Sequence, residues 1–311
     1  MTAQKIIIDT DPGVDDMLAI LLMLAAPNID ALAVTTVAGN ADIQNVTNNA
    51  RFILQLASDD TSLYSGASRP LKRKLTVANV HGASGLDGVN VSEQVELDGR
   101  AVDKILEIVR SNPGEISLLI LGPETNIAQA ILREPDTMKR AKQFVIMGGA
   151  FDVPGNKNMV AEFNIAVDPE AAAIVADFPV PKTYIPLDIC NKIQVPIEEF
   201  ERIDNTKIRK TVVSALRPYI RNINNGELKT NGALMYDVLA AYYLLFPEKC
   251  ETGRDNVKVE TRGKYTYGMT LIDKRPIKER VNPQDSYTQL VTSIDSAVFV
   301  NDFFVVFNSK N

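Results

Sequence analysis

The chemically most suggestive stretch of the chain is Asp9 to Asp16, which places four aspartates around the pair Pro12-Gly13. No lysine or arginine lies between Ile6 and Ala50 to balance their charge. An acidic residue in a first helical turn gains only about 0.3–1 kcal/mol from the helix dipole. That gain cannot offset the repulsion among four neighbouring carboxylates. A bound divalent cation would, and hard oxygen ligands favour calcium or magnesium.

The elements around this stretch predict how it is positioned. The apolar run Ile6 to Ile8 predicts a buried strand, and the apolar pattern from Met17 to Ala26 predicts a helix directly after it. Proline suits the first position of a helix and glycine permits a tight turn, so the Pro-Gly pair fits the junction between them. The aspartates are therefore expected at the carboxyl end of a strand and in the first turn of a helix.

The same alternation of strand and helix continues along the chain. It predicts one α/β domain over residues 1–311, Rossmann-like, with a mostly parallel central sheet flanked by helices and a site at the carboxyl ends of the strands. Further strands are expected at 29–37, 62–66, 116–121, 144–147 and 182–187, and helices at 43–57, 101–109, 127–132, after Asp168, over much of 196–246 and from about Asp302. Two late strands, at 257–261 and around Thr270, suggest a hairpin through Gly268.

Polar residues follow several of these strands. Asn40, Thr125, the loop from Asn156 to Asn164, and Asp237 join the aspartates in this position, and parallel strands bring their carboxyl ends to one edge. The set is rich in acids and amides and nearly free of positive charge. It suits a neutral, hydroxyl-rich ligand such as a sugar, together with a cation, better than a phosphate, which calls for lysine, arginine or a glycine-rich nucleotide loop.

Composition excludes several other classes of protein. The formal net charge is −6 with a pI near 5.1, which argues against a nucleic-acid partner. No apolar run approaches membrane-spanning length, and a strand is expected so early that we expect no signal peptide. Two cysteines, Cys190 and Cys250, fall short of a disulfide framework, so we expect a cytoplasmic protein. The single histidine, His81, excludes most zinc hydrolases.

These residues match a known family. The sequence resembles the inosine-uridine preferring nucleoside hydrolases over nearly its whole length, and the resemblance implies hydrolysis of the N-glycosidic bond of ribonucleosides with bound Ca²⁺. The motifs that carry it are DTDPGVDD at the start, TTVAGN ending at Asn40, VHGASG around His81, GPETNIA around Thr125, VIMGGA around Met147, and AEFNIAVDPEAA with Glu162, Asn164 and Asp168.

The resemblance also implies a role for each matching residue. Asp11 would contact the metal and act as the general base on its water, and the metal would be held by Asp11, Asp16, the backbone carbonyl of Thr125, and Asp237. The ribose hydroxyls would be bound by Asp15, Asn40, Asn156, Glu162 and Asn164. Met147 would pack under the sugar and His81 would lie near the base. The family also implies a homodimer or homotetramer acting on a small-molecule ribonucleoside.

One position departs from the family pattern. Many members carry a histidine, thought to protonate the departing base, where this chain has Tyr236. We expect Tyr236 to hydrogen-bond the leaving group. Two alternatives stay open: a nucleoside- or ribose-binding protein with weak or lost turnover, and, less favoured, a phosphotransferase with an aspartate nucleophile, suggested by the pair Asp9 and Asp11.

Overall fold

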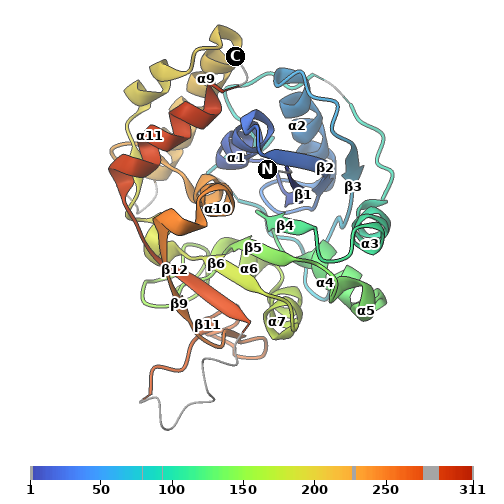
Figure 1. The fold of residues 1–311 in the computed structure, drawn as a ribbon. Helices are drawn as coiled ribbons and strands as arrows, with labels where there is room; N and C mark the ends of the chain where they lie inside the picture. Colours follow the sequence, from blue (N-terminus) through green and yellow to red (C-terminus); the bar gives the residue numbers. More distant parts are fainter. Residues whose placement is uncertain (1–2, 79, 93, 226–228, 276–286, 310–311) are drawn as a thin grey trace.

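The core of the structure, a computed structural model, is an eight-stranded sheet with the order β3-β2-β1-β4-β5-β6-β12-β9 (Figure 1). The structure describes residues 3–78, 80–92, 94–225, 229–275 and 287–309. Every pairing in this sheet is parallel except that of β12 with β9. The strands are β1 (Gln4–Thr10), β2 (Ile29–Thr36), β3 (Leu63–Ser65), β4 (Ser117–Ile120), β5 (Gln143–Met147), β6 (Lys182–Ile185), β9 (Cys250–Arg254) and β12 (Thr288–Ile294).

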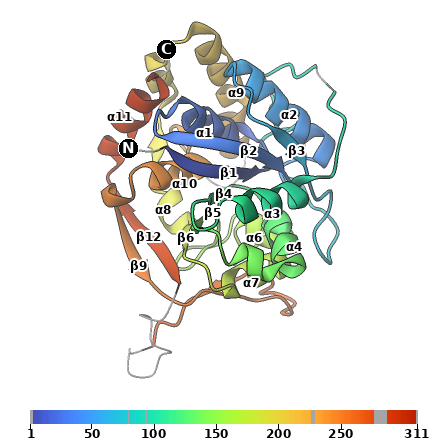
Figure 2. The same ribbon diagram turned by 45° about the vertical axis from the view of Figure 1, so that its right-hand side comes forward.

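Helices cover both faces of the sheet, as Figure 2 shows from a second side. Side chains alternate between the faces along β1, so Ile6 and Ile8 join one apolar cluster and Ile7 joins the other. The first cluster is closed by α1 (Val14–Ala25), α2 (Ile43–Leu56), α9 (Thr206–Asn225), α10 (Tyr236–Leu245) and α11 (Ser296–Phe307). The second is closed by α3 (Ala101–Ser111), α4 (Thr125–Arg133), α5 (Pro135–Met138) and α7 (Pro169–Asp177). This arrangement confirms the predicted α/β fold with a mostly parallel sheet.

Short elements complete the chain. Antiparallel pairs are formed by β7 (Gln194–Val195) with β8 (Ala233–Leu234) and by β10 (Lys258–Val259) with β11 (Thr270–Leu271). The second pair confirms the predicted late hairpin. The remaining elements are α6 (Phe163–Val167), α8 (Leu187–Cys190) and the 3₁₀ helices η1 (Ile197–Arg202) and η2 (Pro247–Lys249). Within the described ranges, no helix combines the length and apolar character needed to cross a membrane.

The carboxyl-terminal part differs most from the sequence-based expectation. Strands β9 and β12 were not predicted. The last helix begins at Ser296 rather than near Asp302, because the Asp295 side chain caps it by accepting hydrogen bonds from the backbone N–H groups of Ala297 and Val298. Asp302 lies inside this helix, where its carboxylate accepts from the Tyr242 hydroxyl.

Candidate active site

The turn between β1 and α1 holds its carboxylates by specific hydrogen bonds. Asp16 accepts from the Thr10 hydroxyl at 2.5 Å and from the Gly13 N–H at 2.9 Å, so its side chain is fixed over the start of the helix. Asn40 lies between two of the acids: its backbone N–H donates to Asp11 Oδ2 at 2.7 Å, and its side chain donates to Asp16 Oδ2 at 3.1 Å. The predicted proximity of the turn and Asn40 is therefore observed.

Asp11 keeps one oxygen free in a crowded place. Its Oδ1 is buried and has no hydrogen-bond partner among the described residues. Gly39 and Gly122 flank the carboxylate, and a Cβ atom at Gly122 would lie 2.6 Å from Oδ1. Burial, followed by the charges of Asp16 and Asp15, raises the pKa of Asp11 well above its ordinary value. An unpartnered buried carboxylate oxygen of this kind calls for a proton or a cation.

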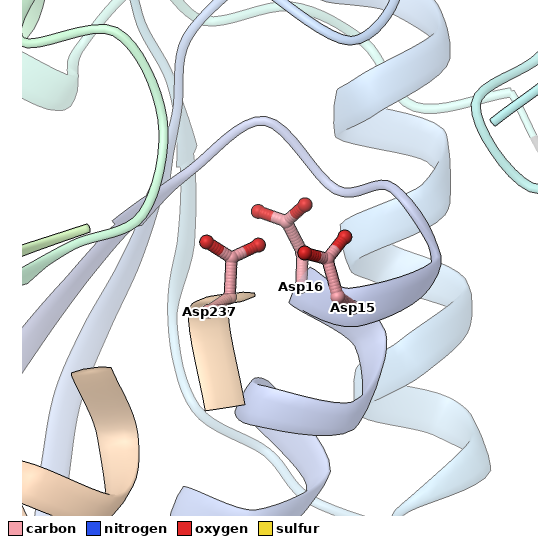
Figure 3. Close-up of side chains that lie close together, drawn as sticks. All are labelled: Asp15, Asp16 and Asp237. Carbon is pink, nitrogen blue, oxygen red and sulfur yellow. The ribbon is translucent and has the colours of Figure 1, made fainter. Parts of the chain in front are cut away.

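Three further carboxylates converge beside it. One oxygen each from Asp15, Asp16 and Asp237 lies within 4.8 Å of the others, and all three side chains are buried (Figure 3). Burial, then the charge of Asp16, raises the pKa of Asp15 to about 8, and the pKa of Asp237 is raised well above its ordinary value by burial and by Asp15. A clustered set of hard oxygen atoms with unfavourable mutual charge fits a divalent cation. The residues present therefore fit the metal that the sequence predicts.

The grouping differs in one detail from the predicted ligand set. Asp15, predicted to bind ribose, belongs to the carboxylate cluster, while Thr125 is the first residue of α4. Its hydroxyl donates to Asp168 Oδ2 at 2.7 Å, and Asp168 also caps α7 through the N–H of Ala171. The predicted helix after Asp168 is confirmed. The role of the Thr125 carbonyl stays a prediction.

A cavity of about 720 Å³ opens beside the cluster, a size typical of small-molecule sites. Nine of the predicted site residues line it: Asp15, Asn40, His81, Met147, Asn156, Glu162, Asn164, Tyr236 and Asp237. The other three, Asp11, Asp16 and Thr125, are at most 1% exposed and do not belong to its lining. The structure thus gathers in one place residues that are spread over most of the sequence.

One side of this cavity consists of side chains fixed by the backbone. Asn164 donates from Nδ2 to the carbonyl of Leu121 at 2.7 Å and to that of Met147 at 3.2 Å, so its Oδ1 has a set direction. Glu162 caps α6 and accepts from the N–H groups of Asn164 and Ile165. Burial raises the pKa of Glu162 to about 7 although these N–H groups oppose the shift. We call this side, with the carboxylate cluster, the acid-amide half.

The other side, the aromatic half, consists of His81, Tyr219, Asn191 and Tyr236. His81 Nδ1 accepts from the Val14 N–H at 3.2 Å, so Nε2 carries the proton and lies 3.8 Å from Asp15 Oδ1. The His81 ring stacks on Tyr219 with centroids 5.1 Å apart. Burial lowers the pKa of His81 to about 4, so the imidazole is neutral at physiological pH despite the nearby carboxylate.

The hydroxyl of Tyr236 is hydrogen-bonded to Asn191, a residue that no sequence motif indicated. This hydroxyl donates to Oδ1 of Asn191 at 2.8 Å, and both residues line the cavity. Asn191 follows β6 by a few residues, so the rule that located the other polar groups after strands could have found it. Tyr219 gave no such signal, because it lies within the long helix α9.

Comparison with known proteins agrees with this geometry. The family model described as inosine-uridine preferring nucleoside hydrolase matches residues 6–301. An uncharacterized protein of Schizosaccharomyces pombe is 40% identical over 86% of this chain and 89% of its own length. The pyrimidine-specific ribonucleoside hydrolase RihA of Citrobacter koseri is 38% identical over 87% and 88%. The solved structure of a purine-preferring ribonucleoside hydrolase from Gardnerella vaginalis superposes with a TM-score of 0.89 at 28% identity, over 99% of each chain.

The chain therefore belongs to the inosine-uridine preferring nucleoside hydrolase family. It is an enzyme that hydrolyses the N-glycosidic bond of ribonucleosides. The phosphotransferase alternative finds no support in the site, because Asp9 is fully buried, accepts from Thr35 and Asn126, and does not line the cavity.

Proposed function

We propose that the chain hydrolyses ribonucleosides to free base and ribose with Ca²⁺ as its cofactor and Asp11 as the general base. Asp11, Asp16, Asp237 and the backbone carbonyl of Thr125 would hold the ion, with Asp15 at its edge. The observation that carries this proposal is the convergence of three buried carboxylates within 4.8 Å at the edge of a 720 Å³ cavity. When bound, the ion lowers the pKa of water and orients the ribose hydroxyls.

Each half of the cavity would have its own task. Asp15, Asn40, Asn156, Glu162 and Asn164 hold the ribose hydroxyls, Met147 packs under the sugar, and His81 lies near the base. The free Oδ1 of Asp11 accepts the proton from the attacking water. Cleavage of the C1′–N bond passes through an oxocarbenium-like state, and the surrounding carboxylates stabilise its positive charge. Tyr236 serves the departing base.

A nucleoside panel tests this function. The protein is incubated with inosine, adenosine, guanosine, uridine and cytidine, and free ribose and free base are measured, with and without prior chelation of metal. We expect equimolar release of both products from at least one nucleoside, and calcium recovered near one per chain. Tight nucleoside binding without any release would instead indicate a binding protein that has lost turnover.

The setting in the cell and the assembly are also proposals. We propose a cytoplasmic homodimer or homotetramer whose partner is the ribonucleoside and which binds neither nucleic acid nor membranes. The two free cysteines, Cys190 and Cys250, support a reducing compartment, and the net charge of −6 argues against nucleic-acid binding. Light scattering of the purified protein measures the oligomeric state directly.

A further inference from the structure

We propose that Asn191 donates the hydrogen bond that stabilises the departing base, and that Tyr236 is the residue that positions it. This inference rests on the proposed hydrolysis and names the residue that replaces the usual leaving-group histidine of the family. It assigns the base-facing donor to a residue that belongs neither to the sequence motifs nor to the carboxylate cluster.

The hydroxyl of Tyr236 has a single proton, and that proton is already used. It is donated to Asn191 Oδ1 at 2.8 Å, so it cannot be donated to a base at the same time. A phenol ordinarily keeps its proton at neutral pH, so Tyr236 stays a donor to Asn191. Tyr236 therefore acts on the base through its partner.

The same hydrogen bond fixes the direction of the Asn191 amide. Because Oδ1 faces Tyr236, the two N–H groups of Nδ2 point away from the tyrosine. Among the described residues these N–H groups have no acceptor. Asn191 lies at the carboxyl-terminal end of α8, where its backbone N–H donates to the carbonyl of Leu187 at 3.0 Å. Because the side chain also lines the cavity, its N–H groups are available to a bound ligand.

The chemistry of the reaction needs a donor at this point. When the C1′–N bond breaks, its electron pair goes to the base, while water forms the new C1′–O bond and gives its proton to Asp11. Negative charge then spreads to the acceptor atoms of the base, and a hydrogen bond to a charged acceptor is about twice as strong as one to a neutral acceptor. The amide stabilises the leaving base without giving up a proton, which the base takes from water after release.

Two other donors near the cavity, His81 and Asn222, are less suited. The Nε2–H of His81 lies 3.8 Å from Asp15 Oδ1, so it faces the acid-amide half. Asn222, a second amide of the cavity lining, donates from Nδ2 to the carbonyl of Val80 at 3.2 Å. Purines and pyrimidines both carry ring-nitrogen or carbonyl acceptors, so Asn191 would serve either class of base.

The test compares Asn191→Leu and Tyr236→Phe on two kinds of substrate. Inosine and uridine need a stabilised leaving group, whereas the p-nitrophenolate of p-nitrophenyl riboside leaves unaided. For Asn191→Leu we expect kcat/KM on both nucleosides to fall about 30- to 100-fold, and on p-nitrophenyl riboside less than about threefold. For Tyr236→Phe, which keeps the amide but loosens it, we expect a smaller fall of about 3- to 10-fold, again only on nucleosides.

Two further variants secure the result. Asn191→Asp keeps the acceptor for Tyr236 and replaces the N–H donors by a carboxylate, whose negative charge also opposes the departing base, so its loss on nucleosides should be at least as large and can be measured even if the leucine variant does not fold. Asn256→Leu, at an amide outside the cavity lining, is the control for the change of side chain, and its kcat/KM on nucleosides should stay within about threefold of the wild type.

Several outcomes would overturn the inference. A larger loss in Tyr236→Phe than in Asn191→Leu would show that the tyrosine donates to the base directly. Equal losses on nucleosides and on p-nitrophenyl riboside would show that Asn191 only supports the sugar site. A wild-type protein that releases no ribose from any substrate would refute the proposed function itself, which separates that failure from failure of this inference.

Discussion

The two halves of the cavity are built differently. In the acid-amide half, Asp16, Asn40, Glu162 and Asn164 each have a buried hydrogen-bond partner that lies at a strand end or within two residues after one, namely Thr10, Asp11, Gly149 and Leu121. In the aromatic half, the residues come from the α8 turn, helix α9, the first residue of helix α10 and the loop that carries His81. The residues proposed to hold the sugar thus have partners at the ends of the sheet strands, while those of the aromatic half lie outside the sheet and touch the other half at the start of α10 and at Val14.

Of the changes considered, removal of the metal is expected to reduce activity most, because the proposed function of the acid-amide half requires the metal. Chelation should reduce hydrolysis of nucleosides and of p-nitrophenyl riboside alike to background, since both share the ribose. It should also lower the melting temperature, because an ion that binds only the folded chain stabilises it. Activity assays and thermal melts after extensive dialysis against a chelator measure both. Full activity in protein shown to be metal-free would contradict the assignment.

The dependence of this stabilisation on pH follows from the carboxylates. Burial raises the pKa of Asp15 to about 8 and also raises that of Asp16, so without metal both bind protons in the folded state that the unfolded chain releases above about pH 4. Metal-free protein should therefore lose stability as the pH rises from 5 to 8. Calcium competes with these protons, so its addition should raise the melting temperature more at pH 8 than at pH 5. An equal rise at both pH values would count against the cluster as the binding site.

Replacement of Asp11 by asparagine tests the proposed general base of the acid-amide half. The variant keeps the shape and removes the base and one negative charge, so kcat should fall by at least about 10²–10⁴-fold on every substrate. A melt confirms that the variant is folded, and its calcium content separates loss of the base from loss of the ion. Turnover near the wild-type rate would show that another group takes the proton.

Recognition of the ribose should show an intermediate effect. Asn164→Ala removes an amide that is fixed by two carbonyls, so we expect kcat/KM to fall about 10- to 100-fold. For the wild type, 2′-deoxynucleosides should be poor substrates, because the groups that bind the hydroxyl would be left unpaired. Deoxyuridine hydrolysed as fast as uridine would mean that these residues do not contact the 2′-hydroxyl.

The smallest effect is expected in the aromatic half at Tyr219. Tyr219→Phe keeps the ring that stacks on His81 and removes only a long hydrogen bond of 3.4 Å to the Leu234 carbonyl. The kcat/KM on uridine and inosine should change by less than about threefold. A tenfold loss on one of the two nucleosides would show that the Tyr219 hydroxyl contacts that base. The aromatic half would then contain a second polar group that binds the base.

Much of the acid-amide half was predictable from the sequence, because one rule places it. Parallel strands end at a common edge, so the residues after β1 and β2 could be expected to meet. Asp237 follows β8, which lies outside that sheet, so this rule does not account for its place in the cluster. Asn191 also follows a parallel strand, β6, but it was not predicted. The position of a strand end does not indicate how many of the residues after it remain close to the site. Tyr219 depends on how α9 packs, which no local pattern reveals.

The predicted fold was right in class and wrong at its carboxyl-terminal edge for a related reason. Strand β12 pairs with β6 across more than a hundred residues, and β9 joins it antiparallel, so neither partner is a sequence neighbour. The local signal for α11 was present in Asp295, whose capping hydrogen bonds begin the helix at Ser296. Asp295 was not recognised as a capping residue because no glycine or proline directly before it marks the start of a helix.

The surroundings of Asp11 have a genetic consequence. Any side chain at Gly39 would meet the Asp11 carboxylate and Pro123, and any side chain at Gly122 would meet the same carboxylate from the other side. A single nucleotide change in either glycine codon can therefore inactivate the enzyme by displacing the Asp11 carboxylate, although every proposed catalytic residue is still encoded. Among naturally occurring alleles of this gene, loss of function should fall at these two positions as readily as at the aspartate itself.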